Sequence, residues 1–408
     1  MENKRIVSSS ENQAVGAFVD ILNRIRAAEL LKKCNAALSR KTLADQELRK
    51  AEAEIEKLIK SNRGGKTGVH GFIGERIQVS FSNERAIMDG SPIRHQLIDD
   101  NGMTDYLRGD TLIQQKACLS DKSLGLKHIL SHAEKYPEFL EKSGVYQIPK
   151  DFYKKYIRFS KMPESQALKL RKEDLRLWRK VHAFNEAFPD AKIEPMQVTY
   201  DEIQADAVGK TISNEAAEVE KKYKKQCESA EKSCRANVKE CAKVVAVSAA
   251  VEGVMDGGFS LLEHCLNGKK ISNFSGDDWK EIGIDTAKGA GKGAIRGAAV
   301  YTATNVFHMP ASLASAAVSG AFIIAEKTME YRRGNCDKKG YAFGVIDGCA
   351  NVAVSALSAE IGKRIIPNPM IGSIVGSLIG GGLYQLTKTI VLRSSSYPSD
   401  KERKEQAA

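Results

Sequence analysis

Apolar residues recur at helical spacing through most of the chain, and short strand patterns interrupt them in one segment. Residues 11–62 carry apolar side chains at every third or fourth position, which predicts two helices. Gly64 and Gly65 end this predicted N-terminal arm, which we place at residues 1–66. The pattern as a whole therefore predicts a mainly α protein.

Residues 67–150 change character, because helix and short strand patterns alternate there. The predicted elements are a helix carrying Glu75 in its first turns, strands at 93–98, 104–107 and 111–118, a helix at 123–142 and a strand at 144–148. We therefore expect a small α+β core, with the element order αβββαβ, inside an otherwise helical protein.

Beyond this core the pattern is helical again. Residues 151–212 form a basic, aromatic-rich connector, and one long helix is predicted over 213–258, with Asp256, Gly257 and Gly258 ending it. Residues 259–392 are rich in Gly and Ala and are expected to form bundled or membrane-active helices. The polar residues 393–408 are expected to form a flexible tail.

Candidate chemistry lies on the predicted hairpin of the α+β core. The two-residue period of a strand places Gln114 and Lys116 on one face, and a hairpin brings Asp105 close to both. Carboxylate and amide oxygens suit Mg²⁺, which prefers oxygen ligands and would polarise a phosphate and acidify a bound water. Lys116 would position that water or stabilise charge on the phosphorus. The spacing therefore favours metal-dependent phosphodiester hydrolysis.

This stretch resembles the PD-(D/E)XK nuclease superfamily. Thr104-Asp105 stands where the family has its PD, and Gln114-Gln115-Lys116 stands where it has (D/E)XK, in the QXK form of some members. Glu75 stands where many members have a helix glutamate that contributes to the metal site. The resemblance implies a restriction-endonuclease-like mixed sheet flanked by two helices, and Mg²⁺-dependent DNA cleavage by Asp105, Gln114, Lys116 and Glu75. Neutral Gln114 replaces the second acid, and Thr104 replaces the proline.

Charge adds a partner to this picture. The chain has 62 Lys and Arg residues against 51 Asp and Glu, a net charge of +11, which favours nucleic acid or an acidic membrane surface. The predicted DNA contacts in the connector are Lys154, Lys155, Arg158, Arg171, Lys172 and Arg176. Interleaved aromatic residues either stack on bases or are buried beneath a solvated basic face.

Small residues repeat at every fourth position in the last third of the chain. The two glycine triplets are Gly289, Gly293 and Gly297, and Gly372, Gly376 and Gly380. Such spacing lets helices approach closely, as in membranes, and the region resembles glycine-zipper segments of membrane-active bacterial proteins. The uncharged stretch 365–387 is long enough to cross a bilayer. Two alternatives stay open: constitutive membrane spans, or a packed bundle that is soluble or inserts conditionally.

Cysteine usage and the N-terminus point to a cytoplasmic protein, associated with the inner membrane if the C-terminal helices insert. The eight cysteines contain no CxxC pair, and the polar N-terminus lacks the apolar stretch of a secretory signal. His128 and His132 would share a helix face without the HExxH motif, so a solvated or partner-facing pair is favoured over a metal site.

The leading hypothesis is a bacterial effector of the defence or toxin type that cleaves DNA with Mg²⁺ and uses its C-terminal helices for membrane contact or assembly. The alternative is a non-enzymatic membrane-active or pore-forming protein whose core only binds nucleic acid or a partner. A helical scaffold is a third hypothesis, and the long helix at 213–258 offers a surface for a homo-oligomer.

Overall fold

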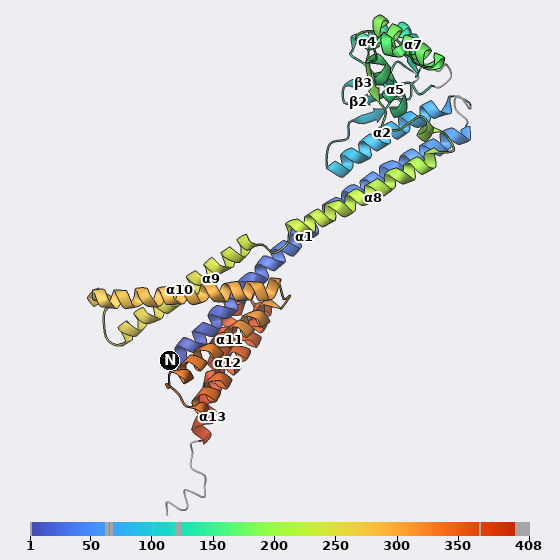
Figure 1. The fold of residues 1–408 in the computed structure, drawn as a ribbon. Helices are drawn as coiled ribbons and strands as arrows, with labels where there is room; N and C mark the ends of the chain where they lie inside the picture. The colour runs from blue at the N-terminus through green and yellow to red at the C-terminus, as the bar shows by residue number, and fades with distance from the viewer. Residues whose placement is uncertain are drawn as a thin grey trace, which may run out of the picture. The chain divides into compact units, whose positions relative to one another are not determined.

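The computed structural model is mainly helical and contains a small mixed sheet (Figure 1). Internal contacts divide it into a sheet unit, Leu30–Ser233, and a helical unit, which combines Met1–Glu29 with Cys234–Ala408. The residues described are 2–61, 65, 68–100, 102–118, 124–366 and 369–395. Most of the predicted tail at 393–408 therefore lies outside the described residues.

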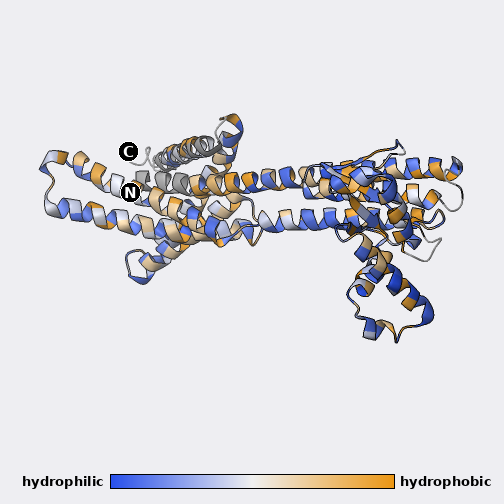
Figure 2. Cartoon of the chain, turned by 90° about the horizontal axis from the view of Figure 1, so that it is seen from above, coloured by the Kyte–Doolittle hydropathy of each residue, from blue (hydrophilic) through white to orange (hydrophobic). Residues whose placement is uncertain are grey.

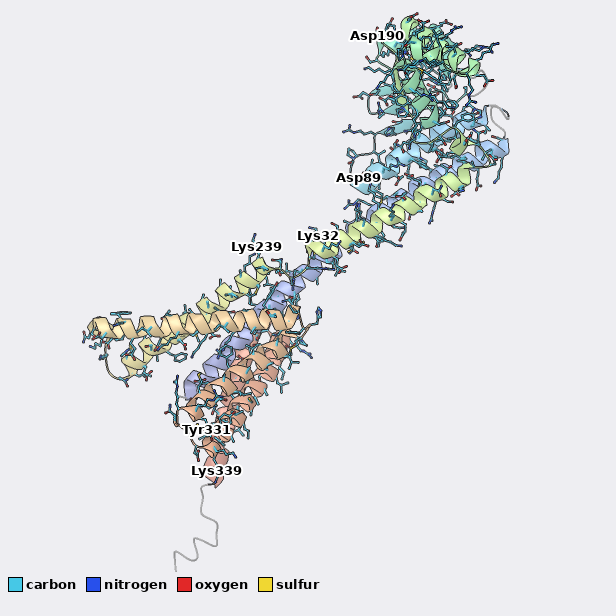
Figure 3. All side chains as sticks on the ribbon, in the orientation of Figure 1. Lys32, Asp89, Asp190, Lys239, Tyr331 and Lys339 are labelled. Carbon is cyan, nitrogen blue, oxygen red and sulfur yellow. The ribbon has the colours of Figure 1, made fainter. Side chains whose placement is uncertain are left out.

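One continuous helix, α1 (Glu2–Ser61), replaces the two helices predicted for residues 11–62. No Gly or Pro occurs between positions 17 and 63, so nothing in this segment interrupts the helix. Within the sheet unit, α1 packs against α2 (Val69–Asp89) and α8 (Val208–Ser233) through buried aliphatic side chains such as Leu48, Ile77 and Val219. Asp89 of α2, labelled in Figure 3, pairs with Lys222 of α8 at 2.8 Å.

The sheet has the order β1-β2-β3-β4-β5, antiparallel from β1 to β3 and parallel from β3 to β5. The strands are β1 (His95–Leu97), β2 (Tyr106–Arg108), β3 (Thr111–Gln115), β4 (Val145–Ile148) and β5 (Lys192–Pro195). Gly109 makes the β2–β3 turn with a φ of +62°, a left-handed conformation that glycine adopts without strain. The fifth strand lies in the segment predicted as connector.

Helices cover both faces of the sheet. On one face, Tyr106, Ile113 and Val145 pack with Val79 of α2. On the other face, Tyr146 and Ile148 pack with the helices that follow β3 and β4. These helices are α3 (Leu126–Lys135), α4 (Pro137–Glu141), α5 (Lys150–Ser160), α6 (Glu164–Ala167) and α7 (Lys172–Ala187).

The elements α2, β1, β2, β3, α3–α4 and β4 follow one another in the predicted αβββαβ order. The helix predicted at 123–142 is two helices, because Pro137 has no N–H to continue the backbone ladder of α3. The predicted first position, Ser123, lies outside the described residues.

The long helix predicted at 213–258 is wrong in both its continuity and its end. The chain leaves helical conformation at 234–237, between α8 and α9 (Val238–Leu266), and the Asn237 side chain caps α9 by accepting the Glu240 N–H at 3.0 Å. Gly257 and Gly258 do not end α9. Gly257 instead packs directly against Thr286 of α10 (Gly276–Asn305), which explains a glycine inside this helix.

The helical unit continues with α11 (Ala311–Arg332), α12 (Lys338–Ile365) and α13 (Pro369–Ser395). The predicted break near Asn305, His308 and Pro310 is confirmed, because α10 ends at Asn305 and α11 begins after Pro310. Tyr331, near the end of α11, and Lys339, at the start of α12, are labelled in Figure 3 on either side of the connection between these two helices.

Both predicted glycine triplets lie at close helix contacts. An added Cβ at Gly289 would come within 2.6 Å of the Glu252 carbonyl oxygen of α9, and one at Gly297 within 3.1 Å of the Val244 carbonyl. At Gly376 an added Cβ would overlap the Ser358 carbonyl of α12. Along each helix pair, later residues of one helix contact earlier residues of the other. The pairs α9–α10 and α12–α13 are therefore antiparallel hairpins whose backbones are in contact.

Replacing Gly293 by Ala should destabilise the α9–α10 hairpin by about 1–3 kcal/mol, because the new Cβ overlaps the Ser248 backbone carbonyl. Gly291, on the same helix, has nothing within 4 Å of an added Cβ, so Gly291→Ala should stabilise by about 1 kcal/mol through helix propensity alone. Thermal unfolding followed by circular dichroism measures both changes. Equal shifts for the two variants would contradict the glycine seam.

Candidate active site

Asp105 is fixed between two strands. Its backbone N–H donates to the Ile113 carbonyl at 2.9 Å, and its own carbonyl accepts from the Ile98 N–H at 2.8 Å. Its Oδ2 accepts the Gln114 Nε2–H at 2.6 Å and the Gln115 backbone N–H at 2.6 Å. The structure therefore brings Asp105 and Gln114 together across the β2–β3 hairpin, as the strand period predicts.

The two polar atoms of the Gln114 side-chain amide differ in their hydrogen bonding. Its nitrogen must face Asp105 Oδ2, because a carboxylate accepts hydrogen bonds and does not donate them. The amide oxygen Oε1 then points elsewhere, and it is buried with no hydrogen-bond partner among the described residues. A buried acceptor without a donor costs free energy, so this oxygen would be stabilised by a cation or a donor group.

Gln115, the middle residue of the triplet, connects the two acidic residues. Its backbone holds Asp105, and its side-chain amide reaches the first turns of α2. In the orientation that satisfies both amide atoms, it donates to the Gly74 carbonyl at 3.3 Å and accepts from the Glu75 N–H at 3.1 Å. The absence of a side chain at Gly74 allows this approach, since an added Cβ would lie 2.5 Å from the Gln115 amide. Sequence reasoning gave Gln115 no role.

The electrostatics show that Glu75, Asp105 and Lys116 share one site. Burial raises the pKa of the Glu75 carboxyl well above its usual range, and the nearby charge of Asp105 raises it further. Burial also raises the pKa of Asp105, while Lys116 and the hydrogen bonds from Gln115 and Gln114 oppose that rise. Ionising both acids side by side costs free energy, and a positive charge between them would reduce that cost.

Lys116 directly follows the last residue of β3. Its backbone N–H donates to the Gln147 carbonyl of β4 at 2.7 Å, which continues the parallel ladder. Its side chain is partly buried and forms no salt bridge with any part of the chain that the structure describes. Its charge acts on the two neighbouring acids, because Lys116 lowers the pKa of Glu75 and of Asp105.

Arg76 is a charged residue that the sequence did not single out. It is buried, and its guanidinium group lies 3.2 Å from Asp99, 3.7 Å from Glu54 and 3.9 Å from Glu75. Its charge lowers the pKa of Glu75 and so opposes the effect of burial. Arg76 also lines a cleft of about 240 Å³ between α1, α2 and β1.

The histidines near this site are structural. His132 is buried, and its ring nitrogens contact the Tyr146 hydroxyl at 2.9 Å and the Met103 carbonyl at 3.1 Å, so the expectation that it is solvated or partner-facing is wrong. Burial, helped by Lys116, lowers the pKa of His132 to about 4, which keeps the ring neutral. His70 is also buried, and it contacts the Tyr200 hydroxyl at 3.3 Å.

The predicted DNA contacts are exposed, whereas the aromatic residues among them are not. Phe152 and Phe159 are buried, and Tyr153 and Tyr156 are partly buried, in the core that α5 and α7 form on the sheet. Exposed side chains are Lys154, Lys155, Arg158, Arg171, Lys172 and Arg176. The buried rings are therefore not accessible for base stacking, and the exposed cations lie on α5, on α7 and at the adjoining residue Arg171.

The oxygen atoms of Asp105, Glu75 and Gln114 fit a magnesium ion, which takes one or two carboxylates and keeps several waters. No group of three or more His, Cys, Asp or Glu side chains that could hold a metal occurs among the described residues. The unpartnered Gln114 oxygen supplies the third donor in this set. Comparison of the chain with known protein families, curated proteins and solved structures finds no match.

Replacing Gln114 by Glu should lower the thermal midpoint in chelator, because a carboxylate oxygen would then face Asp105 at the 2.6 Å contact. Mg²⁺ or Mn²⁺ should reverse the destabilisation, with an affinity about tenfold above that of the wild type, since a ligand charge has been added.

The matched control is Gln147→Glu, at a buried strand glutamine whose amide nitrogen lies 3.5 Å from Glu194. This variant should also be less stable than the wild type, but Mg²⁺ should not restore its stability. Equal responses of the two variants to Mg²⁺ would contradict a metal site at Gln114.

Proposed function

We propose that the sheet unit is a Mg²⁺-dependent nuclease that acts on DNA, built on a restriction-endonuclease-like core of the PD-(D/E)XK type. The observation that carries the proposal is the buried Gln114 side chain, whose nitrogen contacts Asp105 and whose oxygen has no partner among the described residues. Burial raises the pKa of Asp105 and of its neighbour Glu75, so both acids are disfavoured in their charged form. These groups and Lys116 lie on or next to elements that follow one another in the order αβββαβ, which is the order of this nuclease type.

Asp105 would be the central ligand of the ion at the start of the β2–β3 hairpin, with Glu75 reaching it from α2 and the Gln114 amide oxygen from the opposite face of the sheet. When bound, Mg²⁺ polarises the phosphate and acidifies a water molecule. Lys116 would donate to a non-bridging phosphate oxygen and stabilise the charge that develops on it. Gln115 would fix the positions of Asp105 and Glu75 relative to each other, because its backbone N–H donates to Asp105 and its side-chain amide accepts the Glu75 N–H. Arg76 would limit the repulsion between the two acids.

The exposed cations of α5, of α7 and at Arg171 would bind the DNA backbone. These helices cover the sheet face that also contains Leu112, and strand alternation puts Gln114 on the same face. Phosphate contacts from Lys and Arg position a duplex without reading its sequence. At the level of the cell, we propose a bacterial effector of the defence or toxin type, cytoplasmic or at the inner membrane, with the helical unit providing membrane contact or assembly.

A second function is favoured by one observation, namely that Asp105 Oδ2 already accepts two short hydrogen bonds. An acid satisfied in this way is able to stabilise the hairpin without any metal. In that case the core binds nucleic acid or a partner through its basic surface and cleaves nothing. DNA binding without cleavage by the pure protein in Mg²⁺ or Mn²⁺ would favour this function.

Asp105→Ala and Lys116→Ala should each reduce plasmid cleavage in Mg²⁺ by at least about a hundredfold, because one removes a metal ligand and the other removes charge stabilisation. Lys142→Ala, at an exposed lysine that ends α4, should leave the rate unchanged. Gel-based nicking rates measure the effect. Undiminished cleavage by either site variant would rule out the proposed centre.

Replacing Arg171, Lys172 and Arg176 together by Ala should weaken DNA binding and flatten its salt dependence. The slope of log affinity against log salt concentration should fall by about 0.9 for each phosphate that the protein no longer neutralises. Lys57→Ala, at an exposed position of α1, is the control. Fluorescence anisotropy over a salt series measures the slope, and an unchanged slope would place the DNA elsewhere.

A further inference from the structure

The helices α12 and α13 have small and polar residues inside and large apolar residues outside. On α12, Asn351 and Ser355 are buried, whereas Ile346 and Leu357 are each 69% exposed. On α13, Ser373 and Ser377 are fully buried, whereas Leu383 is 58% exposed. This distribution is the reverse of the one that drives folding in water.

The contact between the two helices buries little apolar surface. Gly362 of α12 meets Gly372 and Gly376 of α13 backbone to backbone, and Gly380 meets Ser358. Burial of glycine and serine provides almost none of the hydrophobic free energy that would hold a hairpin together in water. Close packing of small residues is the device that associates helices in lipid, where apolar side chains face the acyl chains.

We propose that the α12–α13 hairpin inserts into a lipid bilayer as a two-helix unit, with its outward apolar side chains against the acyl chains. Positions 340–359 and 369–387 each span about 30 Å, the thickness of the hydrocarbon core. This proposal is independent of the nuclease activity. It commits the helical unit to insertion rather than to surface contact.

The composition of α12 agrees with insertion. Lys338–Ile365 is one of two stretches, among the described residues, long and apolar enough to cross a membrane. The other, Val208–Leu266, is interrupted at 234–237 between α8 and α9. Figure 2 colours the whole chain by hydropathy and shows hydrophobic and hydrophilic residues alternating along its helices.

One formal charge lies within the two stretches, and the hairpin neutralises it internally. Asp347 is buried, and its carboxylate accepts Lys388 Nζ at 2.9 Å and the Tyr384 hydroxyl at 3.1 Å. A paired charge that faces another helix is the form in which ionisable residues are tolerated in a bilayer. The remaining basic residues of α12 lie at its ends, where side chains reach the headgroups. They are Lys338, Lys339, Lys363 and Arg364.

The exposed face extends over both helices and has no covering element among the described residues. Its outward apolar side chains are Phe343, Ile346, Leu357, Ile361 and Ile365 on α12, and Leu378, Ile379, Leu383, Leu386 and Ile390 on α13. Soluble monomers rarely expose a contiguous apolar surface of this kind. Lipid would cover the outward apolar face and would also favour the close contact of small and polar residues between the two helices. A second copy of the chain in water would cover the outward face, but no hydrophobic free energy would then hold α12 and α13 together at their glycines.

Flotation of the full-length protein with vesicles of phosphatidylethanolamine and phosphatidylglycerol tests the proposal. The wild type should float and should resist extraction by high salt and alkaline carbonate. Ile346→Lys replaces a 69% exposed residue near the middle of the span 340–359, and it should lower the vesicle-bound to free ratio by at least about a hundredfold, the penalty for a lysine at the centre of a span. Ile346→Phe should float as the wild type does.

Leu168→Lys, at a 60% exposed leucine of the sheet unit, is the matched control and should not change flotation. Circular dichroism in detergent reports whether Ile346→Lys is folded, and Ile379→Lys, at a 58% exposed residue near the middle of 369–387, repeats the test on α13. Recovery of the wild type in the aqueous fraction, or its release by salt alone, would overturn insertion. A lipid-free oligomer that Ile346→Lys dissociates would assign the face to a second copy, and would also overturn the proposal.

Discussion

Burial of two carboxylates close together is the constraint on which the sheet unit depends. The charges of Glu75 and Asp105 disfavour each other, and removal from water raises the pKa of both groups. Three features compensate, namely the charge of Lys116 directly after β3, the charge of Arg76 on α2, and the hydrogen bonds to Asp105 from Gln114 and Gln115. Apolar residues of similar size at such buried positions are often as stable or more stable, so the acids add little to stability for the free energy that their burial costs.

The interiors of the two units contain different kinds of side chain. The sheet unit buries residues such as Ile73, Ile113 and Phe139, and its basic side chains lie outside. In the helical unit, an ion pair of Glu252 with Arg296 at 3.0 Å lies between α9 and α10, beside the glycine seam. The two interiors therefore differ in composition, with large apolar side chains in the sheet unit and glycines beside a paired charge at the α9–α10 contact.

The local patterns predicted the elements of the core but not where long helices break. The two-residue strand period placed Asp105, Gln114 and Lys116 together, and Glu75 came from the resemblance. The break at 234–237 carries no Pro or Gly and was missed, whereas Gly257 and Gly258 suggested an end that tertiary contact with Thr286 overrides. Strand β5 was missed because four residues with two charges carry almost no periodic signal. The bridging contacts of Gln115 depend on the approach of α2 and were not predictable from sequence.

The chain order of the two units has a consequence for synthesis. Residues 30–233 form the sheet unit, and they are inserted between the first 29 residues of the helical unit and its remainder. During translation the sheet unit is complete before α9 to α13 exist, so its core is able to form first, as domains generally do. The N-terminal segment of α1 has to wait for its partners, among them Tyr301 and Ala314. The helical unit is therefore assembled last, after the whole chain has been made.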